Sequence, residues 1–184
     1  MPQECEYRRQ IGLLDPLDPF VLHPGELDGE WGSKSRRALA GFQQARGLDA
    51  TGELDEATWA ELDKDAVVRV LNRILESELA GVVRYTHYSM MIFGYSRIPI
   101  VKWFRDEATE SLAHAQQAGE MVTRLGGHPS LGIGNLLETH QHDIGQILRE
   151  TLQAEHTALA LYNELLELVA GKSVALEEYA RDLI

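Results

Sequence analysis

The sequence is poor in cysteine, in basic residues and in long hydrophobic runs, and each scarcity excludes a class of protein. Cys5 is the only cysteine among 184 residues, so neither an internal disulfide nor a thiolate metal cluster can form. No apolar run approaches the roughly 20 residues that a membrane-spanning helix needs. Asp and Glu outnumber Lys and Arg by 29 to 17, and the formal net charge of −12 makes nucleic acids and anionic membranes poor partners.

The start of the sequence also lacks a recognisable export signal. The first ten residues, MPQECEYRRQ, do not show the basic and then apolar pattern of a secretory signal peptide, so we expect a cytoplasmic protein. A hydrophobic content of 44% and a charged content of 25% are typical of soluble globular proteins. Prolines and glycines interrupt residues 1–64, whereas residues 65–184 show the periodicity of long amphipathic helices. We therefore predict two domains with these bounds.

Residues 1–64 alternate glycine turns with short helical segments. Ser33 is placed to cap a helix over about 34–46 that Gly47 ends, and Asp55 is placed to cap a second helix through Leu62. Residues 24–62 resemble the peptidoglycan-binding-like domain, a small three-helix module, through Asp28-Gly29, Gly32, Phe42-Gln43, Gly47-Leu48, Thr51-Gly52, Leu54-Asp55 and Thr58. The stretch YRRQIGLLDPLDPF departs from the module's usual first helix, so peptidoglycan and an unknown protein partner both stay open as ligands.

Residues 65–184 predict three long helices and one short helix. The long helices cover about 66–95, 99–125 and 136–170, and Ser173 is placed to cap a last helix of about three turns. The long connection between the second and third of these helices favours a bundle of the ferritin type. We therefore predict an all-α protein: a small N-terminal three-helix domain followed by a helical bundle with a short fourth helix.

Two glutamates lie inside the apolar stripes of these predicted helices. Glu78 is central in the stripe of the first long helix, made of Leu71, Leu75, Glu78, Val82, Tyr85, Ser89 and Ile92. Glu155 is central in the third, made of Leu148, Leu152, Glu155, Leu159, Tyr162, Leu166 and Val169. A lone buried carboxylate is unfavourable by several kcal/mol unless it is paired or binds a metal. Together with His114, the two glutamates favour a hard cation such as iron, although pairing with basic groups remains the alternative.

The segment ESLAHA of the second long helix offers a weaker set of ligands. Ser111 is central in its apolar stripe, and at about 100° per residue His114 lies about 60° from that centre. Glu107 lies about 40° away on the same side, and Glu110 lies about 100° away, near the polar face. Glu107 and Glu110 are candidate metal ligands, but neither replaces a carboxylate at position 111. A histidine at the edge of a stripe is, by itself, more often a hydrogen-bonded core residue.

Residues 66–184 resemble bacterioferritin in three segments, 71–90, 104–132 and 136–168. The resemblance implies a di-iron site in which Glu78 is a ligand, Glu155 a bridging ligand and His114 a nitrogen ligand. It implies that Tyr85 is the catalytic tyrosine beside the irons, as a hydrogen-bond or electron donor. Glu110 matches a position near the family's cavity-side iron site. The resemblance also implies assembly of identical subunits.

Three departures from bacterioferritin qualify this prediction. Ser111 stands where the family has a glutamate, Leu112 stands where it has the methionine that ligates haem, and the sequence ends before the family's last Glu-x-x-His. We therefore predict iron binding without haem, in iron storage or detoxification, with Fe(II) oxidation left open. Two alternatives remain: a non-catalytic ferritin-like scaffold whose N-terminal domain binds a partner, and a cell-wall protein held by glycan.

Overall fold

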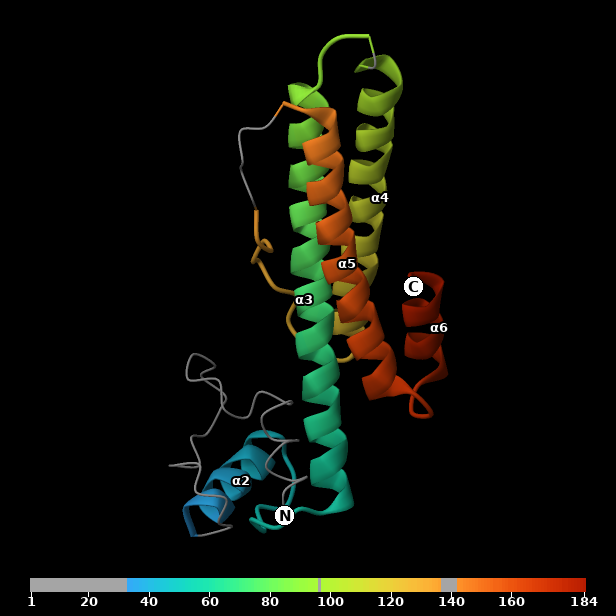
Figure 1. Ribbon diagram of the computed structural model, residues 1–184. Coiled ribbons are helices and arrows are strands. Elements are labelled where there is room, and N and C mark those ends of the chain that lie inside the picture. The colour runs from blue at the N-terminus through green and yellow to red at the C-terminus, as the bar shows by residue number, and fades with distance from the viewer. Residues whose placement is uncertain (1–32, 96, 137–141) are drawn as a thin grey trace. The chain divides into compact units, whose positions relative to one another are not determined.

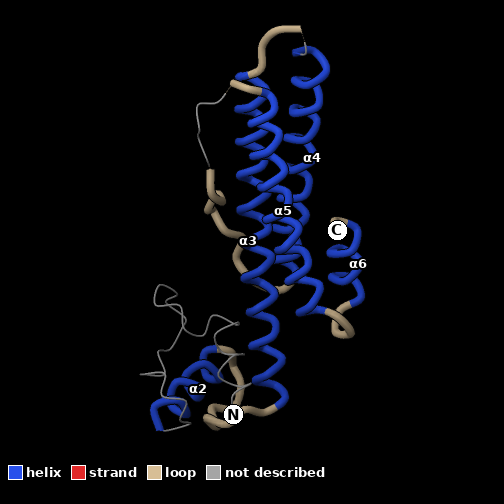
Figure 2. The backbone as a smooth tube through the Cα atoms, viewed as in Figure 1, coloured by secondary structure: helices blue, strands red, loops and turns tan. Residues whose placement is uncertain are grey.

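The structure is a computed structural model that describes residues 33–95, 97–136 and 142–184 (Figure 1). Within these ranges every regular element is an α-helix, which confirms the all-α class (Figure 2). The helices are α2 (Ser33–Ala45), α3 (Glu56–Met91), α4 (Arg97–Arg124), α5 (Ile144–Val169) and α6 (Val174–Asp182). The predicted first helix of the N-terminal domain lies outside the described residues. No described helix has the length and apolarity that a membrane span requires.

The chain divides into two compact units, Met1–Ala66 and Val67–Ile184. Helix α3 passes through this division without interruption. The prediction of one helix ending near Leu62 and another starting near Ala66 was therefore wrong. The intervening residues 63–65 read Asp-Lys-Asp and contain neither proline nor glycine, so nothing in the sequence stops the helix there.

The first unit is organised around the buried side chain of Gln43. Its Nε2 donates to Thr58 Oγ1 at 2.9 Å and to the Glu53 carbonyl at 2.8 Å, and its Oε1 accepts from Gly52 N at 2.8 Å. Asp55 caps α3 as predicted, because its Oδ1 accepts from Thr58 N at 2.8 Å. Gln43, Gly52, Asp55 and Thr58, which are among the residues that carry the resemblance to the peptidoglycan-binding-like domain, thus help to hold this unit together.

The second unit is a bundle in which α3, α4 and α5 lie lengthwise side by side and α6 accompanies one end of α5 (Figures 1 and 2). One buried cluster includes Leu71, Val122 and Leu165, and α6 covers it with Leu176 and Tyr179. A second cluster receives side chains from α3, α4 and α5 but none from α6: Tyr85, Tyr88, Ile92, Val101, Phe104 and Ile147. The short fourth helix therefore covers only part of the bundle.

Helix α5 begins later than the sequence predicted. Its first residue is Ile144 rather than a residue near 136, and Asp143 caps it by accepting from Gln146 N at 3.0 Å. Residues 131–136 are not helical, and Gly134 N donates to the Glu76 carbonyl at 2.8 Å. This hydrogen bond ties the crossover to α3, and Asp143 rather than a residue near 136 caps α5. Ser173 caps α6 as predicted.

The predicted apolar stripes agree with the structure in α3 and α4 but not in α5. Leu148 and Leu152 are 40% and 58% exposed, whereas Ile147 and Thr151 are buried. The prediction continued one apolar stripe along the whole of α5, although it also gave the fourth helix only about three turns. Helix α6 lies beside only the C-terminal part of α5 (Figure 1), and the N-terminal part instead buries Ile147 in the cluster that it shares with α3 and α4.

Candidate metal centre

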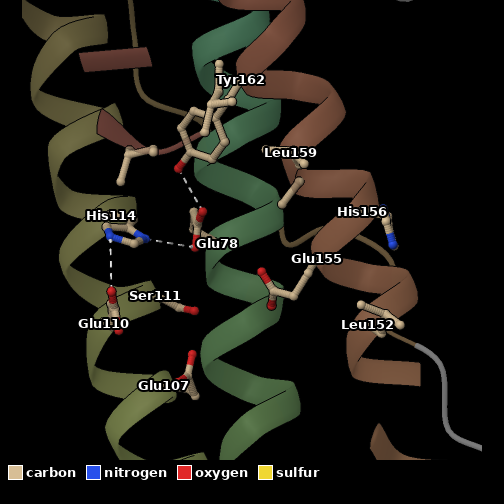
Figure 3. A pocket seen from close by; sticks show the side chains of 13 residues that line it. Glu78, Glu107, Glu110, Ser111, His114, Leu152, Glu155, His156, Leu159 and Tyr162 are labelled. Carbon is tan, nitrogen blue, oxygen red and sulfur yellow. Dashed lines mark hydrogen bonds and ion pairs between the residues drawn. The ribbon is translucent and has the colours of Figure 1, made fainter. Parts of the chain in front are cut away.

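A pocket of about 370 Å³ in the second unit is lined by side chains of α3, α4 and α5 and by the residues after α6. All the predicted metal ligands line it: Glu78, Glu107, Glu110, His114 and Glu155 (Figure 3). Helix α3 supplies Glu78, and α5 supplies Glu155. Helix α4 supplies Glu107, Glu110 and His114. Helices far apart in the sequence thus bring these side chains to one place.

Glu78 is the buried carboxylate of the pocket, with 8% of its surface exposed. Its Oε1 accepts a hydrogen bond of 2.8 Å from the Tyr162 hydroxyl, and its Oε2 lies 3.8 Å from His114 Nδ1. Burial raises the pKa of Glu78, while the Tyr162 bond and the His114 charge oppose that rise; the nearby Glu155 charge adds to it. A carboxylate that is unfavourable to ionise in the folded protein is stabilised by a bound cation.

Glu155 lies across the pocket from Glu78 (Figure 3) and is exposed, so its predicted place inside a buried stripe of α5 was wrong. It accepts a hydrogen bond from the Tyr85 hydroxyl, and Tyr85 is itself buried and stacked on Phe104 with ring centroids 5.9 Å apart. Partial loss of hydration raises the pKa of Glu155, and the Arg84 charge opposes this. Tyr85 therefore contacts a predicted ligand, although it does not line the pocket.

His114 stands between two carboxylates, which approach opposite nitrogens of its ring. Glu78 faces Nδ1 at 3.8 Å, and Glu110 faces Nε2 at 4.0 Å with a side chain that is 65% exposed. An ion bound at Nδ1 would therefore lie beside Glu78 as well. Glu110 faces the opposite nitrogen, where it is placed to orient the ring. Glu107 is half-buried; desolvation and then the Glu110 charge raise its pKa, while the Trp103 indole opposes that rise.

Ser111 occupies the centre of the α4 stripe and fits closely against α3. A Cβ added at Gly81 would lie 2.8 Å from Ser111 Oγ and 3.3 Å from Ser111 Cβ, so the two helices are near contact here. The nearby Ser111 hydroxyl also lowers the pKa of Glu78. Two neutral hydroxyls, from Ser111 and Tyr162, thus surround Glu78 where a second carboxylate would stand.

The donor set suits a hard cation, yet it is not assembled around one point. Carboxylates and an imidazole are ligands that iron accepts. Among the described residues, however, no three His, Cys, Asp or Glu side chains are gathered closely enough to hold an ion. The pocket groups form pairs instead: Glu78 lies beside His114, and Glu155 hydrogen-bonds to Tyr85 behind the lining. Binding iron therefore requires side chains to move from this arrangement.

Sequence reasoning missed two residues that line the pocket, Tyr162 and His156. Tyr162 was assigned only to the apolar stripe of α5. Its signal was present, since it follows Glu155 by the same seven residues by which Tyr85 follows Glu78. His156 is exposed and lies outside the predicted apolar stripe, which contains its neighbour Glu155.

Comparison with known proteins identifies the family of the second unit. The model of the ferritin-like domain family matches residues 68–184. The chain belongs to the ferritin-like family. A bacterioferritin from Rhodobacter capsulatus is 32% identical to this ferritin-like chain over 102 residues, which are 53% of the chain and 60% of the relative. The chain thus spans less than two thirds of that relative's length.

Two further comparisons concern the fold and the first unit. A solved ferritin-like, diiron-carboxylate protein from Bacillus anthracis str. Ames superposes with a TM-score of 0.59 at 22% identity, covering 66% of this ferritin-like chain and 84% of that one. This likeness supports the fold. A model of a peptidoglycan binding domain matches residues 14–62. Both resemblances predicted from the sequence are therefore confirmed.

Proposed function

We propose that the protein binds iron at this pocket and serves in iron storage or detoxification. The observation that carries the proposal is the meeting of Glu78, His114 and Glu155, from three helices, in one pocket of a ferritin-like unit. Iron is the substrate here. When dioxygen or peroxide is present, each Fe(II) gives up one electron to it, and the pocket carboxylates neutralise the added positive charge.

The five predicted ligands and Tyr85 each have a proposed role. Glu78 is a ligand, His114 binds through Nδ1, and Glu155 bridges two ions. Glu107 and Glu110 also lie on α4 and line the pocket, where their negative charges attract cations. Tyr85, hydrogen-bonded to Glu155, is placed to orient that carboxylate and to donate an electron.

A non-catalytic scaffold is the second candidate function. It is favoured by the Tyr162 hydroxyl, which hydrogen-bonds to Glu78 without any metal, and by the neutral Ser111 hydroxyl near the same carboxylate. In this alternative the bundle mediates assembly and the first unit recruits a protein partner or cell-wall glycan. Retention of the full chain on isolated peptidoglycan tests the glycan arm.

Two broader properties complete the proposal. We place the protein in the cytoplasm, in keeping with the sequence expectation. We also propose that identical subunits associate, because α5 leaves Leu148 and Leu152 exposed along the part of the bundle that α6 does not cover. Haem is not included, since Leu112, which is 42% exposed on α4, offers no sulfur ligand.

Anaerobic titration with Fe(II), followed by metal analysis and calorimetry, separates the iron-binding protein from the scaffold. We expect saturable binding that Glu78→Ala and Glu155→Ala each weaken at least roughly tenfold, the scale of losing one strong ligand. Glu164→Ala is the matched control, because Glu164 lies on α5 but pairs with Arg73 outside the pocket at 2.7 Å. Absence of binding, or binding indifferent to both pocket substitutions, would refute the proposed function.

A further inference from the structure

Tyr162 presents its hydroxyl to the same part of the pocket as Glu78 and His114. Only 3% of its surface is exposed, yet it lines the pocket, and its hydroxyl points at Glu78 Oε1 from 2.8 Å (Figure 3). The other oxygen of the same carboxylate lies 3.8 Å from His114 Nδ1. A phenol oxygen and an imidazole nitrogen therefore lie beside the two oxygens of one carboxylate.

The chemistry of these donors points to a particular oxidation state of the metal. Carboxylate and imidazole alone leave an iron ion beside Glu78 with too few protein ligands, and Ser111 supplies no charged oxygen there. A phenolate is a hard, anionic oxygen ligand, and tyrosine ligates ferric iron in some haem enzymes. We propose that Tyr162 is a direct ligand of Fe(III) in this pocket, with Glu78 and His114, in place of the carboxylate that position 111 lacks.

This inference rests on the proposed function, because it assumes that iron reaches the pocket. In the binding step the Tyr162 O–H bond breaks, an O–Fe bond forms, and the proton leaves to solvent through the open side of the pocket. No electron is transferred, so no oxidant is needed when Fe(III) is supplied as such. Glu78 is then released from its hydrogen bond to Tyr162 and is free to bind the same ion.

Tyr85 provides a matched control within the same unit. It is as buried as Tyr162, with 2% of its surface exposed, and it too donates a hydrogen bond to a pocket glutamate. Its ring, however, stacks on Phe104 and does not line the pocket. Tyr162 is thus the proposed ligand, and Tyr85 is a similarly buried tyrosine that only orients a carboxylate.

Visible absorption of the full chain loaded with Fe(III) nitrilotriacetate tests the inference, with bound iron measured in parallel. Ferric phenolate gives a charge-transfer band in the visible region that ferric carboxylate lacks. We expect the band in the wild-type protein and in Tyr85→Phe, and its loss in Tyr162→Phe. Resonance Raman spectra of wild-type protein carrying ring-deuterated tyrosine, which should show shifted phenolate modes, test the same bond without any substitution.

The outcomes distinguish this inference from the proposed function. Iron bound without the band, or a band of full strength in a folded Tyr162→Phe protein, overturns the Tyr162 ligand and leaves iron binding in place. Raman modes without any deuterium shift overturn it as well. If no iron is retained by the wild-type protein, the proposed function fails and this inference fails with it.

Discussion

The Tyr162 hydroxyl on α5 lies 2.8 Å from Glu78 Oε1 on α3. The reverse pair joins Tyr85 of α3 to Glu155 of α5. Each tyrosine follows the glutamate of its own helix by seven residues, about two turns, and the two helices run in opposite directions (Figure 1). The same spacing on antiparallel helices therefore gives each carboxylate a phenol from the other helix.

Glu78→Gln is expected to stabilise the metal-free protein at neutral pH. Burial raises the pKa of Glu78 above its usual value of 4.5, so the folded state holds this proton to higher pH than the unfolded state. Stability is therefore lost as pH rises from 4.5 through the folded-state pKa. Glutamine keeps an acceptor for Tyr162 without the charge. We expect the Tm at pH 7 to rise by roughly 2–4 °C, which corresponds to about 1 kcal/mol.

Thermal melts followed by circular dichroism in the presence of a chelator check this expectation. The gain should shrink towards zero as the pH approaches 4.5, where the unfolded state also becomes protonated. Glu164→Gln removes a charge from the exposed pair with Arg73 and should not raise the Tm. An equal gain at pH 7 and at pH 4.5 would show that the buried charge is not its cause.

The helices that the sequence predicted well are those whose apolar stripe faces one continuous core. In α3 and α4 the buried positions repeat at helical spacing, as they do for Leu71 and Leu75 or for Ala115 and Ala118. In α5 the buried face depends on how far α6 extends, and no local pattern in α5 carries that information. Leu148 and Leu152 were misplaced for this reason.

The candidate site was predictable only in part, for a similar reason. A glutamate inside an apolar stripe is visible in one helix alone, so Glu78 could be found by periodicity. The bond from Tyr162 to Glu78 depends on the axial offset of two antiparallel helices, which the crossover and its hydrogen bond to Glu76 help to set. The carboxylate beside each ring nitrogen of His114 likewise could not be predicted without the position of α3 relative to α4.

Gly52→Ala should destabilise the first unit more than Gly47→Ala does. Both glycines have a φ of 70°, a conformation that costs a residue with a Cβ roughly 1 kcal/mol or more. A Cβ at Gly52 would also lie 2.8 Å from the Arg36 carbonyl oxygen, whereas a Cβ at Gly47 meets nothing within 4 Å. Gly47→Ala therefore controls for backbone strain alone.

Amide hydrogen exchange of residues 33–66 in the full chain measures this difference. We expect faster exchange at Thr58 in Gly52→Ala, because moving the Gly52 loop also disturbs the hydrogen bond from Gly52 N to Gln43. Equal protection in the two variants would mean that the Arg36 backbone gives way without cost. The result also bears on glycan-binding assays, since variants in this motif would then lose binding through unfolding.

Self-association is expected to depend on the part of α5 that α6 leaves uncovered. Sedimentation velocity should show the wild-type chain as a dimer or larger, and the double variant Leu148→Lys, Leu152→Lys as a monomer at the same concentration. Leu131→Lys is the control, because Leu131 is 94% exposed in the crossover rather than on α5. If all three proteins sediment alike, this surface is not where the subunits meet.

Ser111→Glu is expected to tighten iron binding while destabilising the metal-free protein. The new carboxylate would join Glu78 in the pocket, where both charges lose hydration and repel one another. A bound cation reverses that penalty, so we expect roughly tenfold higher iron affinity, which is about 1.4 kcal/mol. Calorimetric titration with Fe(II) gives the affinity, and melts with and without iron give the two stabilities.

Ser111→Gln separates charge from size in this experiment. Glutamine has the shape of glutamate and meets the same close packing against Gly81, but it cannot neutralise a cation. We expect Ser111→Gln to lower the stability of the metal-free protein by crowding alone, without any gain in iron affinity. Equal iron affinities for Ser111→Glu and the wild-type protein would mean that the serine is not what weakens the site. If Tyr162 is the ligand that compensates for Ser111, the Fe(III) charge-transfer band should also fade in Ser111→Glu, because the new carboxylate competes with the phenolate for the same ion.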